Sequence, residues 1–277
     1  MKVGVLGGTF NPIHLGHLGI AELILQIFKL EKVIFVPAKL PPFKSESLNY
    51  SAGDRYKMVE LSIEKYPKFE ISDIEYRSDK TSYTVTTLQE LLKEKNLTPS
   101  DLGFIMGADS WLNVEKWWNY SELFKLSNFL IVTRGHDPQT EEKIKLIAEK
   151  MGFCYNERKE GFFFNEEKEH ENEPRHSSAA PSKGRLPRPA AVKSPEIQEN
   201  ISETARDLPT SNKERGNSPY MIENFKNSLG LELNIIRISP IDISSTQIRS
   251  KIEKNQSVDE LVSPEILNLI QEGYTSA

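Results

Sequence analysis

Short apolar runs rich in β-branched residues alternate with longer segments of helical period from the N-terminus to about residue 150. This alternation is typical of β-α units around a parallel sheet, and near-continuous apolar runs are typical of strands covered on both faces. The predicted strands are Val3–Leu6, Lys32–Pro37, Glu70–Glu75, Gly103–Met106 and Phe129–Thr133. The predicted helices are Leu15–Phe28, Arg55–Lys65, Val85–Lys95, Ser121–Leu126 and Glu141–Lys150. The pattern therefore predicts an α/β fold, with helices flanking a parallel sheet.

The pattern changes after Cys154. Residues 155–225 are dense in charge, proline, serine and asparagine and poor in aliphatic residues, so they bury too little apolar surface to offset the entropy of ordering. Apolar periodicity resumes at Leu231 with LELNIIRIS and continues into ISSTQIRSKIEKN. We therefore expect one domain, formed by residues 1–154 and 226–277, interrupted by a disordered, low-complexity insertion over residues 155–225.

The composition indicates which classes of partner and which cellular compartment to expect. The chain has 277 residues, is 38% hydrophobic and carries a formal charge of -5, so it can bury a core unaided and has no basic field for nonspecific nucleic-acid binding. Cys154 is the only cysteine, which excludes a disulfide within the chain and indicates a reducing compartment. Neither a leader pattern nor a bilayer-spanning apolar run is present. We expect a cytoplasmic protein with no nucleic-acid or membrane partner.

The stretch GGTFNPIHLGH, at residues 7–17, is the first candidate for chemistry. Glycines between a buried strand and a helix permit a close backbone approach to a ligand, and the helix amides can face an anion. His14 and His17 are three residues apart, so on a helix they share one face and could stabilise charge on phosphoryl oxygens. A tight turn alone also needs glycine, so the glycines do not decide the matter. Zinc lacks convincing further ligands, and a P-loop lysine is missing.

A second anion signal lies near the C-terminus in ISSTQIR, residues 243–249. Ser244, Ser245 and Thr246 supply a helix cap and hydroxyl donors, and the Arg249 guanidinium one turn later can bind phosphate oxygens in a fork. An ordinary capped helix with a surface arginine remains the alternative.

Together, GGTFNPIHLGH and ISSTQIR resemble the nucleotidylyltransferase superfamily with the HxGH signature. Four further motifs, in this order, resemble bacterial nicotinate-nucleotide adenylyltransferase: PPFK (Pro41–Lys44), SYTVTTL (Ser82–Leu88), GADSWLNVEKWW (Gly107–Trp118) and VTRGHD (Val132–Asp137). The resemblance covers about residues 1–150 and 230–277 and does not explain the insertion.

The resemblance implies a Rossmann-like sheet and the reaction of nicotinate mononucleotide with ATP, with Mg²⁺ as cofactor, to give deamido-NAD and pyrophosphate. No covalent enzyme intermediate is implied, so the protein contributes positioning and charge stabilisation. The implied ATP-binding residues are Gly7, Gly8, Thr9, Phe10, His14, His17, Ser245, Thr246 and Arg249, and His14, His17 and Arg249 among them would be catalytic. The implied nicotinate mononucleotide-binding residues are Lys44, Thr84, Asp109, Trp117 and Arg134.

Within the implied acceptor site, Trp117 matches the aromatic residue that stacks on the pyridine ring, Thr84 lies in the loop that addresses its carboxylate, and Asp109 matches a ribose-binding position. Asn11 stands where the family often has Asp, and Phe43 where it often has His. The pattern shows no obvious acidic group that would favour a neutral amide, so we predict a preference for nicotinate mononucleotide of at least about a hundredfold.

Two other functions remain open. A sister enzyme, such as phosphopantetheine adenylyltransferase or a cytidylyltransferase, would use the same phosphate cradle, although the acceptor-side motifs argue against it. A nucleotide-sensing module without turnover is the alternative from a different class, and the intact His14, His17 and Arg249 argue against it. The oligomeric state, including a homo-oligomer, is left open by the sequence.

Overall fold

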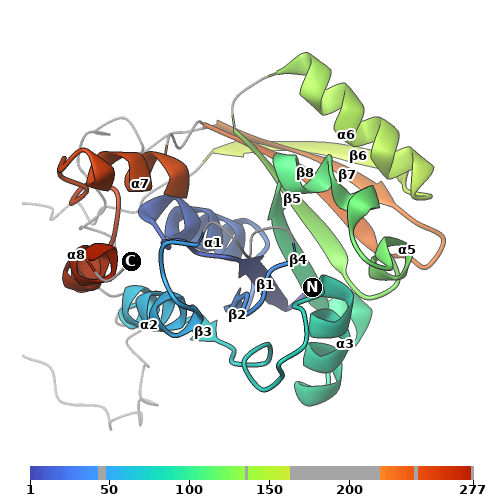
Figure 1. The fold of residues 1–277 in the computed structure, drawn as a ribbon. Coiled ribbons are helices and arrows are strands. Elements are labelled where there is room, and N and C mark those ends of the chain that lie inside the picture. Colours follow the sequence, from blue (N-terminus) through green and yellow to red (C-terminus); the bar gives the residue numbers. More distant parts are fainter. Residues whose placement is uncertain (43–47, 135–136, 163–218, 240–242, 276–277) are drawn as a thin grey trace, which may run out of the picture.

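The computed structural model describes residues 1–42, 48–134, 137–162, 219–239 and 243–275. These residues form an eight-stranded sheet in the order β3-β2-β1-β4-β5-β8-β7-β6 (Figure 1). The strands are β1 Val3–Gly8, β2 Lys32–Pro37, β3 Phe69–Ile71, β4 Leu102–Gly107, β5 Asn128–Arg134, β6 Cys154–Phe162, β7 Pro219–Lys226 and β8 Glu232–Ile238. Strands β1 to β5 and β8 are parallel, and β7 and β6 add an antiparallel extension at one edge.

Helices cover both faces of the sheet (Figure 1). One buried cluster packs α1, α2, α7 and α8 against the sheet, and a second packs α3 to α6 against its opposite face. The helices are α1 Leu15–Ile27, α2 Ala52–Ile63, α3 Thr84–Glu94, α4 Ala108–Trp111, α5 Tyr120–Leu123, α6 Pro138–Lys150, α7 Ser245–Glu253 and α8 Leu267–Thr275. Short 3-10 turns lie at Pro99–Asp101, Val114–Lys116 and Pro264–Ile266.

Strand β2 shows why the apolar runs are nearly continuous. Val33 and Phe35 belong to the cluster on the α1 and α2 side, whereas Ile34 and Val36 belong to the cluster on the α3 side. Successive side chains of a strand point to opposite faces, so a strand between two helical layers needs an apolar residue at every position. The predicted α/β, Rossmann-like architecture is confirmed.

The order of the strands creates a crevice at the centre of the sheet. β1 pairs in parallel with β2 on one side and with β4 on the other, because the chain builds β2 and β3 in one direction and then crosses back to β4 and β5. In open α/β sheets, ligands bind outside the carboxyl ends of the strands where the strand order reverses. The predicted strand Val3–Leu6 is too short, because Gly7 and Gly8 are the last residues of β1. The fold places the segment Gly7–Phe10, which we call the glycine turn, opposite the start of α4, which follows β4.

Several predicted boundaries agree closely with the structure, and β2 matches residue for residue. The strand expected at Glu70–Glu75 is too long, because β3 ends at Ile71. The chain turns there: the backbone N–H of Ile74 donates to the Ser72 hydroxyl oxygen, and that of Tyr76 donates to the Asp73 carbonyl.

The expected insertion at residues 155–225 is also too wide, since residues 154–162 and 219–226 form the antiparallel pair β6–β7. β6 was missed because it is the edge strand and the side chains from Cys154 to Glu160 are exposed, so it shows no apolar alternation. The rest of that prediction, residues 163–218, lies outside the described residues. Among the helices that are described, none has the length and apolar character needed to cross a membrane.

Candidate active site

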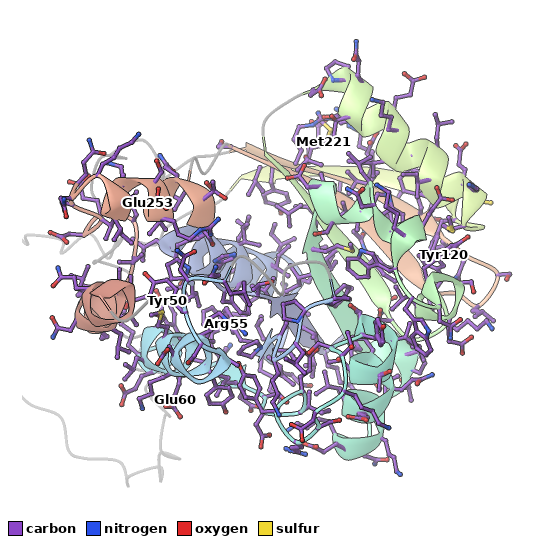
Figure 2. The ribbon with its side chains drawn as sticks, in the orientation of Figure 1. Tyr50, Arg55, Glu60, Tyr120, Met221 and Glu253 are labelled. Carbon is purple, nitrogen blue, oxygen red and sulfur yellow. The ribbon has the colours of Figure 1, made fainter. Side chains whose placement is uncertain are left out.

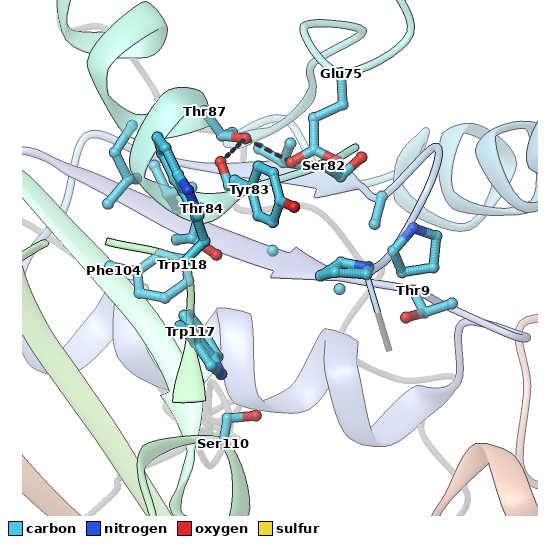
Figure 3. Close-up of a pocket in the computed structure, with 18 of the residues that line it drawn as sticks. Thr9, Glu75, Ser82, Tyr83, Thr84, Thr87, Phe104, Ser110, Trp117 and Trp118 are labelled. Carbon is cyan, nitrogen blue, oxygen red and sulfur yellow. Dashed lines mark hydrogen bonds between the residues drawn. The ribbon is translucent and has the colours of Figure 1, made fainter. Parts of the chain in front are cut away.

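A pocket of about 570 Å³ opens at the carboxyl ends of β1 and β4, where the strand order reverses (Figure 3). Its walls come from the glycine turn after β1, the segment after β2, the start of α3, and the segment from α4 to Trp118. Of the predicted site residues, the lining includes Gly7, Gly8, Thr9, Thr84, Asp109 and Trp117. The pocket therefore unites the glycine turn with the two motifs expected to bind the acceptor nucleotide.

The N-terminus of α3 supplies a site for an anion in this pocket. Helix α3 begins at Thr84, and its N-cap residue, Tyr83, makes no side-chain hydrogen bond that caps the helix. Both residues line the pocket. The first amides of a helix have no partner within the helix, and the helix dipole makes that end positive. A carboxylate of the right size can therefore satisfy the first turn of α3 from the pocket side.

The tryptophans divide between core and pocket. Trp111 is completely buried, so it is a core residue. Trp117 lines the pocket and meets Phe104 edge to face, with ring centroids 6.4 Å apart. Trp118 is 53% exposed and stacks on Tyr83, with centroids 5.0 Å apart. Trp117 and Trp118 thus give the pocket an aromatic wall that a planar ring can contact.

Asp109 lies in the first turn of α4 and is exposed at the pocket, as are its neighbours Ser110, Asn113 and Lys116. These side chains form a polar wall that continues into the aromatic one. Figure 3 shows Ser110 beside Trp117 on this side of the pocket. The arrangement provides hydroxyl, amide, carboxylate and ammonium groups for the polar part of a nucleotide.

The sequence shows no obvious acidic group that would favour a neutral amide, but the structure places the carboxyl group of Glu75 at this pocket in addition to the predicted Asp109. Glu75 lines the wall beside α3, and its Oε1 accepts a hydrogen bond of 2.6 Å from the Thr87 hydroxyl (Figure 3). No described group meets hydrogen-bond geometry with Oε2. Burial raises the pKa of Glu75, against the opposing effect of the Ser82 and Thr87 hydroxyls. Glu75 was missed because it was assigned to the end of a predicted strand, Glu70–Glu75, whereas β3 ends at Ile71.

Arg55 is a second residue that sequence reasoning missed, since it was expected only to begin a helix. It is completely buried, and Nη1 donates to the carbonyls of Thr9 and Ala38 at 2.7 and 2.6 Å. Nη2 donates to the Lys39 carbonyl at 3.2 Å. Burial lowers the pKa of Arg55. Arg55 thus ties the glycine turn to the segment that follows β2.

The two signature histidines lie together at the start of α1. His14 is the N-cap residue rather than part of the helix, and its ring stacks on that of His17 with centroids 3.7 Å apart. The backbone N–H of His14 donates to Nδ1 of His17 at 3.3 Å, which directs the proton of the neutral His17 ring to Nε2. Phe10 packs edge to face on His17, with centroids 5.1 Å apart. His17 therefore has a fixed orientation beside the glycine turn.

Helix α7 packs against the segment just before the histidines, at Asn11 and Pro12, although it lies more than two hundred residues away in sequence. The Ser245 hydroxyl donates to the Pro12 carbonyl at 2.9 Å. Arg249 donates to the Asn11 carbonyl at 2.8 Å and to the Thr246 hydroxyl at 3.2 Å. The predicted cap at Ser244 is confirmed, because its hydroxyl accepts the backbone N–H of Gln247. The lining of the described pocket excludes the other predicted ATP-binding residues, which are Phe10, His14, His17, Ser245, Thr246 and Arg249.

Some expected site residues are not described. Lys44 and Phe43 lie outside the described residues, and Arg134 is the last residue of β5, with a side chain that is not described. Asn11 is buried, and its Oδ1 has no hydrogen-bond partner among the described groups. Within the described ranges, no cluster of three or more His, Cys, Asp or Glu side chains is arranged to hold a metal ion.

Comparison with known proteins identifies relatives. The cytidylyltransferase-like family model matches residues 5–251. A Geotalea daltonii protein named probable nicotinate-nucleotide adenylyltransferase is 43% identical over 157 residues, covering 56% of this chain and 72% of that protein. A protein of the same name from Carboxydothermus hydrogenoformans is 46% identical over 135 residues, covering 48% and 65% of the two chains.

Among solved structures, the Plasmodium falciparum nicotinic acid mononucleotide adenylyltransferase complexed with NaAD is similar to this chain at a TM-score of 0.43 and 22% identity. The similarity covers 51% of this chain and 70% of that one. The family match over most of the chain and the identity to the curated relatives lead to one assignment. This chain belongs to the cytidylyltransferase-like family and, within it, to the nicotinate-nucleotide adenylyltransferases.

Proposed function

We propose that this protein transfers the adenylyl group of ATP to nicotinate mononucleotide, giving deamido-NAD and pyrophosphate. One observation carries the proposal: a single glycine turn, Gly7–Phe10, has an aromatic pocket with an open helix N-terminus on one side and the histidine and α7 cluster beside it. The first arrangement fits a pyridine ring that bears a carboxylate, and the second fits a polyphosphate. The names of the curated relatives support the same reaction.

In the proposed acceptor site, the pyridine ring packs against Trp117, and its carboxylate accepts hydrogen bonds at the N-terminus of α3, where Thr84 lies. In this proposal the ribose hydroxyls bind to Asp109, which lines the pocket. This orientation directs the 5′-phosphate toward Gly8 and Thr9, at the other end of the pocket lining. A volume of about 570 Å³ falls within the range of small-molecule sites.

In the proposed reaction, an oxygen of the 5′-phosphate attacks the α-phosphorus of ATP in line. The bond from that phosphorus to the α,β-bridging oxygen breaks, and pyrophosphate leaves with its electron pair. Nε2–H of His17 and the backbone of the glycine turn donate to the phosphoryl oxygens, where negative charge increases. Ser245, Thr246 and Arg249 hold the outgoing pyrophosphate. We propose that Mg²⁺ arrives with ATP and neutralises part of the phosphate charge.

The test is pyrophosphate release from ATP with a panel of acceptors: nicotinate mononucleotide, nicotinamide mononucleotide and phosphopantetheine, with CTP as the alternative donor. We expect the highest kcat/KM for nicotinate mononucleotide with ATP. A higher value for phosphopantetheine or for CTP would favour a sister enzyme. Tight binding of nucleotide with no product would favour a sensing module. We also infer a cytoplasmic location, since the proposed substrates are highly charged metabolites.

A further inference from the structure

Arg55 occupies a position that is unfavourable for a cation. It lies in the first turn of α2, at the positive end of the helix dipole, and its side chain is completely buried. The Glu75 carboxyl acts on Arg55 electrostatically, but among the described residues the guanidinium forms no ion pair with it, and Arg55 Nε has no hydrogen-bond partner there. Burying a charge that forms no ion pair costs stability. Burial is the stronger effect here, because it lowers the pKa of Arg55 against the influence of Glu75.

The contacts of Arg55 lie behind the walls of the pocket. Figure 2 places Arg55 between α2 and the centre of the fold, and its hydrogen bonds end on the backbone at Thr9, Ala38 and Lys39. Thr9 and Ala38 line the pocket. The regular pairing of β1 with β2 extends to the backbone N–H of Ala38, which donates to Gly8 at 2.8 Å. Arg55 continues this connection beyond the point where the ladder ends.

The direction of one peptide group follows from this contact. The C=O of Thr9 and the N–H of Phe10 belong to the same planar trans peptide and point in opposite directions. Because Arg55 holds the Thr9 carbonyl, the N–H of Phe10 is directed away from Arg55. Phe10 itself has φ of 48°, a left-handed conformation that a bulky residue rarely adopts, so the turn needs external support to keep this geometry.

We propose that Arg55 is a positioning residue for adenylyl transfer, holding the Thr9–Phe10 peptide so that its N–H faces the reacting phosphate. The inference rests on the proposed function. Arginine suits this role because its planar, forked guanidinium reaches carbonyls from two segments at once and keeps its charge when buried, whereas lysine presents a single nitrogen. The same charge adds to the positive potential behind the turn.

The test compares Arg55→Lys with the wild-type protein and with a matched control, Phe153→Leu. Lysine retains the charge and most of the volume, so the variant should fold. Phe153 is completely buried in the cluster that packs α3 to α6 against the sheet, and it is not among the residues that line the pocket. We expect Arg55→Lys to lower kcat by about tenfold to a hundredfold, because a small misplacement of a donor is costly. KM for nicotinate mononucleotide should change little. Phe153→Leu should lower Tm and leave kcat unchanged.

A second readout separates positioning from general stability. In Arg55→Ala, millimolar guanidinium chloride should restore part of kcat, and sodium chloride at the same ionic strength should not. A wild-type kcat in folded Arg55→Lys would overturn the role of Arg55. So would a loss of kcat in Phe153→Leu as large as that in Arg55→Lys, if the two variants have the same Tm. Absence of turnover in the wild-type protein would instead overturn the proposed function, and this inference with it.

Discussion

The two sides of the glycine turn are built differently. On the pocket side, a volume of about 570 Å³ is bordered by an exposed aromatic wall and a helix end without a side-chain cap. On the histidine side, the side chains are held by hydrogen bonds to nearby backbone: Ser245 to Pro12, Arg249 to Asn11, and Nδ1 of His17 to the N–H of His14. The pocket side is shaped to receive a group, whereas the histidine side is arranged to orient donors. Changes on the first side should alter substrate choice, and changes on the second should alter the rate.

The largest effect is expected on the histidine side. His17→Ala should lower kcat by roughly 10²–10³, because it removes a preorganised donor from charge that develops in the transition state. Steady-state kinetics with ATP and nicotinate mononucleotide will measure the loss, and circular dichroism will show whether the fold is intact. Near-wild-type turnover in a folded variant would remove His17 from the mechanism and end the distinction between the two sides.

On the pocket side, the expected effect is on selectivity. A nicotinate carboxylate can accept two hydrogen bonds at the N-terminus of α3, whereas the NH₂ of nicotinamide would face those donors without satisfying them. An unsatisfied buried donor costs about 1–3 kcal/mol, so kcat/KM should favour the acid by at least about a hundredfold. Trp117→Ala should weaken both substrates about equally, because stacking does not depend on the substituent. Equal kcat/KM for acid and amide would contradict this assignment of the pocket.

The residues that sequence reasoning missed share a physical cause. Buried strands and amphipathic helices have a period that is visible locally, so β2 and the helices α1, α2, α3 and α6 were predicted to within a few residues. The short α4 and the C-terminal α8 were not predicted. Arg55 and Glu75 act through contacts with Thr9 and Thr87, 46 and 12 positions away, which no local pattern encodes. The position of α7 beside the histidines was expected from the family resemblance. The residue types in ISSTQIR alone were equally compatible with an ordinary capped helix that has a surface arginine.

A smaller effect is expected when Glu75, in the pocket wall, is replaced by glutamine, and this effect is on stability. Burial raises the pKa of Glu75 above the ordinary value of a glutamate side chain. A carboxyl group with a raised folded-state pKa stabilises the fold below its unfolded pKa, and that contribution is lost as pH rises through the folded pKa. Glu75→Gln keeps an oxygen that can accept from Thr87 and removes the buried charge. The variant should therefore raise Tm at about pH 8 by a few degrees, where about 1 kcal/mol corresponds to roughly 2–4 °C.

The control for this prediction is pH itself. Near the ordinary pKa of a glutamate side chain, about 4.3, the wild-type carboxyl binds more protons in both the folded and the unfolded protein, so the difference in Tm should shrink. Thermal unfolding of both proteins across this range will measure the trend. A Tm difference that grows as pH falls would show that Glu75 is stabilised as the anion, contrary to its burial.

The smallest effect is expected from removing residues 163–218, which lie outside the described residues and contain none of the motifs on either side of the glycine turn. The β6–β7 ladder runs from Cys154 opposite Lys226 to Phe162 opposite Pro219, so the two ends of the removed segment are already neighbours. A short linker with an Asn-Gly turn, about four residues long, can join them. Kinetics should then show kcat and KM for both substrates close to the wild-type values.

A wider deletion of residues 155–225 is the matched control. It removes β7, whose Ile222 and Phe225 are buried in the two hydrophobic clusters on opposite faces of the sheet. Truncating one large buried side chain costs about 2–5 kcal/mol, so loss of both, together with the β7–β8 ladder, should lower Tm sharply or prevent folding. The narrow deletion should keep most of the wild-type Tm. If the narrow deletion folds but loses turnover, residues 163–218 would have to contribute to the reaction, and catalysis would no longer be explained by the two sides of the glycine turn alone.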